Sequence, residues 1–103
     1  MVMGEQTLET EVAVIGGGPG GYAAAFRAAD HGFDVALINQ EDKLGGVCLL
    51  RGCIPAKVLL EVAKLIHDAR GADDWGLRYD DVEIDVDALR EHKDLVIKRL
   101  VNG

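Results

Sequence analysis

The sequence predicts an α/β fold, and three features near its start carry that prediction. Residues 11–15 are short, β-branched and mostly apolar, as in a buried parallel strand. They run directly into a glycine-rich turn at residues 16–21, and residues 20–31 then form a small-residue, helix-favouring segment with Gly32 placed to end it. Residues 33–38 are a second strand by composition, so the whole unit has the size of one βαβ crossover.

The segment after the second strand is predicted to be a loop followed by a helix. Residues 39–52 are polar and contain glycine, which favours a loop. After Pro55, apolar side chains repeat at helical spacing as far as Ala69, with Gly71 as the expected terminator. The second helix is therefore expected to begin close to the two cysteines.

A third helix is expected at the end of the chain. Residues 72–83 are acidic and irregular, and the helix after them begins near Asp85 or Asp87, either of which can cap it. Its expected apolar face consists of Leu89, Val96 and Leu100. Only two strands of a parallel sheet are predicted in all, and a chain of 103 residues leaves room for one small domain at most.

Composition limits the classes of function. With 49% hydrophobic and 28% charged residues the chain is typical of a globular protein. The net charge of −7 argues against sequence-independent binding to nucleic acid, which needs an excess of Lys and Arg. The first residues lack the pattern of a signal or transit peptide, and no apolar run approaches the roughly 20 residues of a membrane helix. A cytoplasmic location away from the membrane is therefore expected.

The glycine-rich turn has the spacing of a dinucleotide-binding loop. Gly16, Gly18 and Gly21 stand in a GxGxxG pattern after a strand and at the opening of a helix, which is the context the pattern requires. The first glycine permits a sharp turn, the second lets the backbone approach a pyrophosphate, and the third lets helix and strand pack closely. The helix N-terminus supplies N–H groups and partial positive charge. The alternative is a glycine-rich turn that binds nothing.

Asn39 takes the place of an expected acidic residue. In such folds an Asp or Glu about 20 positions after the glycines accepts hydrogen bonds from a ribose. The oxygen of an Asn side chain can still accept from a hydroxyl, although without charge assistance, and Glu41 lies two residues further on. The alternative is that Asn39 is an ordinary turn residue at a strand end.

Cys48 and Cys53 are candidates for a redox centre. A C-x4-C pair at the beginning of a helix can close into a disulfide, while the helix N-terminus favours the thiolate of an exposed sulfur. A zinc site is disfavoured because no second cysteine pair exists and the histidines are widely scattered, at His31, His67 and His92. Two buried, unreactive cysteines are the remaining alternative.

The segments GGGPGGYAAAFRAA and GGVCLLRGCIPAK together resemble the flavin-binding start of the pyridine nucleotide-disulfide oxidoreductase family, which includes glutathione and mercuric reductases. Within that family, the Cys-Ile-Pro sequence, WGL and DVDALREHKDLVIKRLVNG are most similar to the dihydrolipoamide dehydrogenase branch. The chain departs from the usual family pattern at four positions, which are Asn39, Leu50, Arg51 and Ala56.

The resemblance implies a partial Rossmann-like, doubly wound FAD-binding domain, of which residues 1–103 are the amino-terminal part, with the NAD-binding and dimerisation domains absent. It implies that Cys48 exchanges with the substrate disulfide, that Cys53 lies against the flavin, and that Lys57 sits near the flavin ring. Without the resemblance, Lys57 would be read as a solvated surface lysine. The full set of implied cofactor-binding residues is Gly16, Gly18, Pro19, Gly20, Gly21, Asn39, Gln40, Gly45, Gly46, Val47, Cys48 and Lys57.

The activity implied by the resemblance is electron transfer between a dithiol substrate such as lipoamide, the cysteine pair, FAD and NAD. The parent enzyme is expected to be a homodimer and a component of a 2-oxo acid dehydrogenase complex. Because the 103 residues hold no second GxGxxG, the chain alone is expected to be inactive and to hold FAD weakly or not at all. The alternatives are another family member, similar to mercuric or glutathione reductase, and a non-catalytic nucleotide-binding or thiol-redox module.

Overall fold

The computed structural model describes residues 4–103, and the chain divides into two compact units. The first is Met1–Gly46 and the second is Val47–Gly103. Each unit is described by itself below. Among residues 4–103, no helix is both long enough and apolar enough to cross a membrane.

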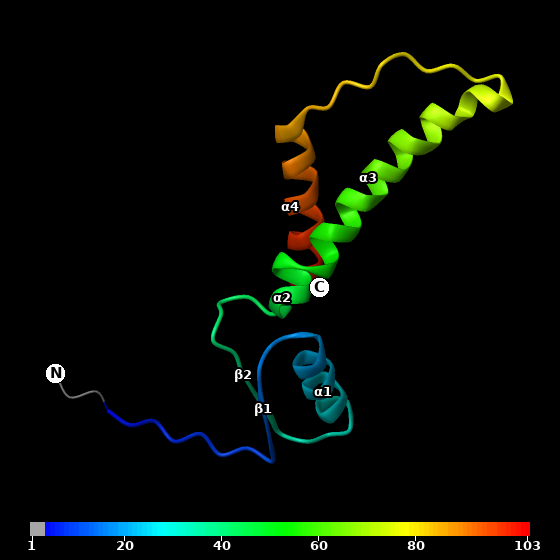
Figure 1. Ribbon diagram of the computed structural model, residues 1–103. Helices are drawn as coiled ribbons and strands as arrows, with labels where there is room; N and C mark the ends of the chain where they lie inside the picture. The colour runs from blue at the N-terminus through cyan, green and yellow to red at the C-terminus, as the bar shows by residue number, and fades with distance from the viewer. Residues whose placement is uncertain (1–3) are drawn as a thin grey trace. The chain divides into compact units, whose positions relative to one another are not determined.

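The first unit is a strand, a helix and a second strand. Strand β1 (Val12–Ile15) and strand β2 (Val35–Ile38) pair in parallel, with Val12 opposite Val35 and Ile15 opposite Ile38. Helix α1 (Pro19–Asp30) joins them and contacts both strands, as the blue and cyan ribbon in Figure 1 shows. The α/β class and the strand, helix, strand order predicted from the sequence are therefore confirmed, although both strands are shorter than the predicted ranges 11–15 and 33–38.

Local sequence explains where α1 begins and ends. Gly18 precedes the helix in an extended conformation, and Pro19 takes the first helical position, where its missing N–H needs no partner. His31 caps the other end, and Gly32 follows at φ 88°, in the left-handed region that closes helices at low steric cost. The predicted stop at Gly32 is thus confirmed.

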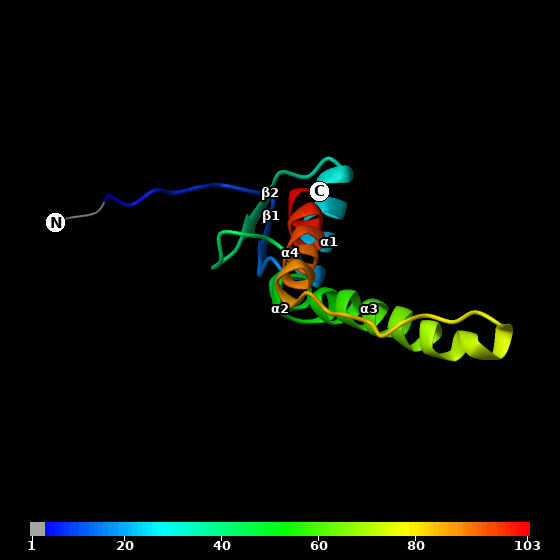
Figure 2. The same cartoon turned by 90° about the horizontal axis from the view of Figure 1, so that it is seen from above.

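The second unit consists of helices: α2 (Gly46–Arg51, whose first residue closes the first unit), α3 (Cys53–Gly71), a short 3₁₀ helix η1 (Ala72–Trp75) and α4 (Val86–Asn102). Helices α3 and α4 are in contact and run in different directions, as Figures 1 and 2 show. No residue of either helix is buried. The contact therefore covers only part of each helix surface.

The prediction of a continuous loop over residues 39–52 is wrong, because α2 occupies its second half. Residues 47–51 contain neither glycine nor proline, and straight-chain residues lose little side-chain freedom in a helix. The side chain of Leu49 is buried, which adds a packing term to this short helix. Helix α3 also begins earlier than predicted, at Cys53, because Pro55 is tolerated in a first turn where the backbone N–H has no helical partner.

Asp85 is the N-cap of the last helix. It is one of the two cap residues, Asp85 and Asp87, that the sequence offered. Its carboxylate accepts a hydrogen bond of 3.0 Å from the N–H of Ala88, while Asp87 lies in the first turn. The acidic segment before it is not wholly irregular, since η1 forms one turn there and Gly76 ends that turn at φ 77°. Glycine adopts this left-handed conformation without the strain of a Cβ atom.

The hydrophobic core of the described residues is very small. The buried apolar residues are Ala25, Leu49 and Ala72. Ile15 and Ile38, at the carboxyl ends of the two strands, are 84% and 52% exposed. On the predicted apolar face of α4, Leu89 and Val96 are half-buried but Leu100 is exposed. Many of the large apolar side chains in residues 4–103 are therefore exposed rather than packed in a core.

Candidate functional site

The glycine loop, residues 16–21, connects the end of β1 to the start of α1. Gly16 adopts φ 107°, a conformation that side chains other than glycine rarely accept, and its N–H donates to the carbonyl of Ile38 over 2.8 Å. This bond continues the pairing of the two strands by one residue. The loop therefore turns sharply at the carboxyl edge of the sheet, where open α/β sheets bind their ligands.

The third glycine of the motif allows helix and strand to approach closely. A Cβ atom at Gly21 would collide with the carbonyl group of Gly16 and would touch the side chain of Val14. Gly18, the residue before α1, offers no side chain to cap the first helical N–H groups. A pyrophosphate fits such a place, because these N–H groups and the helix dipole favour an anion. The sharp turn at Gly16 and the close helix–strand packing at Gly21 that the GxGxxG pattern predicts are both present.

The segment before the cysteines lies directly against the glycine loop. The N–H of Gly45 donates to the carbonyl of Gly17 over 2.8 Å, and the N–H of Gly17 donates to Oδ1 of Asn39 over 3.2 Å. A Cβ atom at Gly46 would stand 2.8 Å from the Cα atom of Gly18. The first unit thus brings three of the predicted cofactor residues, Asn39, Gly45 and Gly46, to the loop. Gln40 is exposed beside them.

Sequence reasoning missed Gly17, which is buried and central to this arrangement. A Cβ atom there would lie 2.7 Å from Cγ of Asn39 and 2.8 Å from Cδ2 of Leu44. The only signal in the sequence was the run of three consecutive glycines, whose middle member the GxGxxG pattern does not use. Gly17 is needed because the 39–46 segment closes over it.

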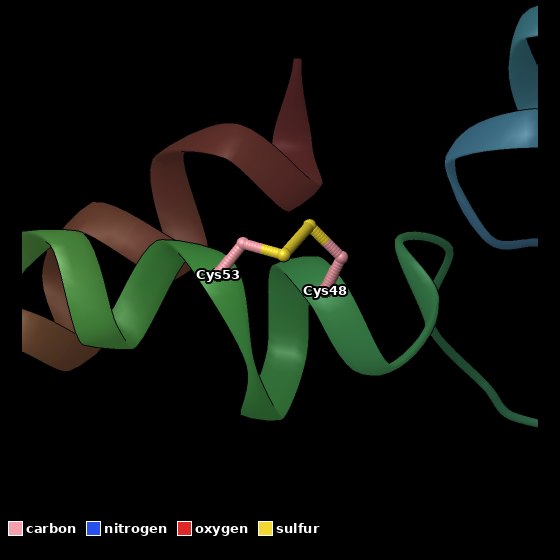
Figure 3. The surroundings of a disulfide bond; sticks show 2 residues. All are labelled: Cys48 and Cys53. Atoms are coloured by element: carbon pink, nitrogen blue, oxygen red, sulfur yellow. A yellow bond between two sulfur atoms is a disulfide. The ribbon is translucent and has the colours of Figure 1, made fainter.

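Cys48 and Cys53 form a disulfide, so the predicted pairing is confirmed. Cys48 belongs to α2 and Cys53 is the first residue of α3, with their Cα atoms 4.6 Å apart. Figure 3 shows the two side chains reaching toward each other across the break between these helices. That Cα separation lies within the range usual for disulfides.

Gly52 makes the break between α2 and α3 possible, and sequence reasoning missed it as well. Its backbone adopts φ −130° and ψ −109°, outside the helical region. A Cβ atom there would lie 2.9 Å from the carbonyl oxygen of Val47 and 3.3 Å from Cα of Cys48. The close approach of the two helices therefore depends on a residue without a side chain at this position.

The surroundings of the disulfide suit thiol exchange. Cys48 is half-buried and Cys53 is exposed, so a thiol can reach the pair. Cys53 begins α3, whose N-terminal N–H groups favour a thiolate. Lys57 follows one helical turn later on the same side of α3 and is exposed. Val47, Cys48 and Lys57 belong to the second unit and the other predicted cofactor residues to the first.

Some of the remaining charged groups of the second unit form surface pairs. Lys64 and Asp68 are one helical turn apart on α3, and their hydrogen bond raises the pKa of the exposed lysine. Among residues 4–103, no three His, Cys, Asp or Glu side chains are grouped to hold a metal ion. The candidate functional groups are therefore the glycine loop in the first unit and the disulfide in the second.

A glycine-rich GxGxxG turn after a first strand, followed in the chain by a disulfide between two consecutive helices, is typical of a class of redox protein, and comparison with known families identifies it. Residues 10–102 match the pyridine nucleotide-disulphide oxidoreductase family, and the chain belongs to that family.

Several proteins named dihydrolipoyl dehydrogenase are similar to this chain. The chain is 47% identical over 94 residues to dihydrolipoyl dehydrogenase of Buchnera aphidicola from Acyrthosiphon pisum, covering 91% of the chain and 20% of that protein. It is 47% identical over its whole length to dihydrolipoyl dehydrogenase 2 of Haloarcula marismortui, covering 21% of that protein. A dihydrolipoyl dehydrogenase of Geobacillus stearothermophilus is 42% identical, again over the whole chain and 22% of the relative. The chain thus spans about a fifth of the length of these relatives.

Proposed function

We propose that this chain is the amino-terminal part of the FAD-binding domain of an enzyme with dihydrolipoyl dehydrogenase activity. The observation that carries the proposal is the Cys48–Cys53 disulfide at the start of α3, in a chain whose first unit ends β1 in a dinucleotide loop. FAD is the cofactor that membership of the family implies. The names of the relatives favour dihydrolipoamide over glutathione or mercuric ion as the substrate.

The glycine loop holds the cofactor in this proposal. Gly18 and the first turn of α1 present N–H groups to the pyrophosphate, and the absence of a side chain at Gly21 keeps that turn close to the strand. FAD supplies a two-electron acceptor for the dithiol that the reaction leaves on the protein. Pro19, Gly20, Gln40 and Val47 complete the set of residues placed at the cofactor.

The cysteine pair performs the exchange with substrate. A thiolate of dihydrolipoamide attacks Sγ of Cys48, which forms a mixed disulfide and releases Cys53 as a thiolate. The second thiol of the substrate then displaces Cys48, so the substrate leaves as a disulfide and the protein holds a dithiol. With Cys53 on its side of the pair, the flavin would supply the two-electron acceptor that returns the dithiol to the disulfide, and NAD⁺ would be the final acceptor. In reverse, the Cys48 thiolate attacks the substrate disulfide.

Charge around the cysteine pair supports different roles for Cys48 and Cys53. Each exchange step leaves a thiolate, and the N-terminus of α3 stabilises negative charge at Cys53. Lys57 adds a positive charge one turn along the same helix. We assign Cys53 and Lys57 to the flavin side and Cys48 to the substrate side, as the family resemblance implies.

The remaining functions belong to parts of a longer protein. Residues 1–103 are one part of an FAD-binding domain in this proposal, and an NAD-binding domain and a dimerisation domain complete the enzyme. The proposed assembly is a homodimer that acts on lipoamide within a 2-oxo acid dehydrogenase complex. The support is the size of the relatives, of which this chain spans about a fifth.

The test uses the full-length protein that contains this segment. Purified protein should retain a flavin absorbance band after gel filtration and should form NADH from NAD⁺ with dihydrolipoamide. Thiols that serve as substrates of other disulfide reductases, such as glutathione, should give little turnover. A protein that retained flavin but preferred glutathione would move the assignment to another branch of the family, and a protein without flavin would contradict the proposal.

A further inference from the structure

Asn39 uses every polar atom of its side chain inside the first unit. Its Oδ1 accepts from the N–H of Gly17 over 3.2 Å. Its Nδ2 donates to the carbonyl of Glu41 over 2.8 Å and to the carbonyl of Lys43 over 3.0 Å. The amide has two N–H donors, and both are used within the 39–46 segment.

These bonds join two pieces of backbone that the sequence separates by more than 20 residues. Gly17 is held on both sides, since Asn39 accepts from its N–H and Gly45 donates to its carbonyl. The side chains of Asn39 and Leu44 lie so close to Gly17 that a Cβ atom there would overlap both. The side chain of Asn39 is therefore the link between the middle of the glycine loop and the turn that leads toward Cys48.

The chemistry of the link requires an amide. A carboxylate could accept from Gly17 but could not donate to the two carbonyl oxygens, and its negative charge would face their partial negative charge at hydrogen-bonding distance. The acidic residue that dinucleotide folds commonly place here, which binds a ribose hydroxyl, could not make the same set of bonds. In this chain, position 39 therefore holds backbone segments together instead of binding a ribose hydroxyl.

We propose that Asn39 is a positioning residue that clamps the 39–46 segment onto the glycine loop, and that it does not read the ribose of the nucleotide. The inference rests on the proposed function in so far as the loop binds FAD. The clamp itself is a property of the first unit with or without cofactor. It sets the spacing between the loop and the segment that precedes Cys48 in the chain.

The decisive variant is Asn39→Asp, because the two interpretations predict opposite results. A ribose-binding residue gains charge assistance from the carboxylate, so FAD would bind more tightly. A clamp loses two donated bonds and gains repulsion, so FAD should bind about 5- to 10-fold more weakly. Gln6→Glu serves as the matched control, since it adds the same charge in an exposed segment before β1.

Amide hydrogen exchange in the FAD-free, full-length protein tests the clamp without the cofactor. In Asn39→Asp the amides of Gly17 and Gly45 should exchange at least about tenfold faster than in the parent, with the thermal unfolding midpoint recorded alongside. If Asn39→Asp does not fold, Asn39→Ala removes all three bonds without repulsion and should give at least the same local acceleration. Gln6→Glu should leave both rates unchanged.

Unchanged exchange at Gly17 and Gly45, or tighter FAD binding by Asn39→Asp, would overturn the clamp. Faster exchange at these two amides with weaker FAD binding supports it. A parent protein that binds no FAD at all would refute the proposed function, while the exchange rates would still decide whether Asn39 holds the two segments together.

Discussion

The Cα atoms of Cys48 and Cys53, which belong to different helices, lie 4.6 Å apart because the helical path is broken at the glycine between them. A single uninterrupted helix would place residues five positions apart on different sides of its surface and about 7.5 Å apart along its axis. The break after α2 is thus what allows this spacing of cysteines to close into a disulfide.

The first prediction concerns the cysteines themselves. In the full-length protein, Cys48→Ser and Cys53→Ser should each abolish dihydrolipoamide-dependent NAD⁺ reduction, because neither variant can form the disulfide, while FAD stays bound through the glycine loop. Turnover and flavin absorbance are measured on the same preparations. The parent protein should gain two alkyl groups on reduction and neither variant should. Near-normal turnover in either variant would show that the electron path does not pass through this pair.

The second prediction concerns Gly52→Ala. The added methyl would stand 2.9 Å from the carbonyl oxygen of Val47, a backbone atom that cannot move away without disturbing α2. We expect the substitution to destabilise the folded protein by about 1–3 kcal/mol, which is typical of overpacking. The oxidised form should be destabilised more than the reduced form. The oxidised fraction at equilibrium in a glutathione redox buffer measures it.

Gly71→Ala is the control for this variant, because a Cβ atom at Gly71 meets nothing within 4 Å at the end of α3. Gly71→Ala should leave the oxidised fraction of Cys48 and Cys53 unchanged from that of the parent protein. An oxidised fraction that is the same in Gly52→Ala and in the parent would mean that the α2–α3 break tolerates a side chain.

The third prediction concerns Gly21→Ala in the glycine loop. Its methyl group would collide with the carbonyl of Gly16, so the start of α1 must move away from β1. FAD should then be lost on gel filtration, whereas the Cys48–Cys53 disulfide, which lies wholly in the second unit, should still form. Flavin content and thiol alkylation separate the two effects. Full flavin content in this variant would contradict the assignment of the loop.

The fourth prediction concerns the cap of α4. Asp85→Ala removes the acceptor for the N–H of Ala88 and should lower the free energy of unfolding by about 0.5–2 kcal/mol. Asp85→Asn keeps an oxygen acceptor and should recover most of the loss. Denaturant unfolding of the three full-length proteins provides the comparison. Equal stabilities would mean that α4 starts without help from residue 85.

Local sequence signals predicted the elements that local chemistry determines. Strand, helix and strand in the first unit, the stop at Gly32 and the cap at Asp85 all follow from residues within a turn of the position concerned. The C-x4-C spacing correctly predicted a disulfide, although the intervening α2 was taken for a loop. A six-residue helix gives too short a periodic pattern to recognise, and the burial of Leu49 that supports it is a tertiary effect.

The missed residues depend on contacts that a one-dimensional pattern does not contain. Gly17 must lack a side chain because Asn39 and Leu44, more than 20 residues away, close over it. Gly52 must lack one because its Cβ atom would crowd the backbone of Val47 and Cys48 in α2. Asn39 was correctly placed directly after the second strand, but its three hydrogen bonds depend on the path of residues 41–45, which no motif specifies.

Ile15 and Ile38, left open to water at the ends of the two strands, have a consequence for synthesis. In a protein of the relatives' length, a ribosome adding about 5–20 residues per second would need some tens of seconds to deliver the rest of the polypeptide. During that interval the nascent chain presents unfinished apolar edges, which bind chaperones or neighbouring nascent chains. Translation slowed beyond residue 103 should therefore increase aggregation of this protein, and a ribosome-associated chaperone should suppress it.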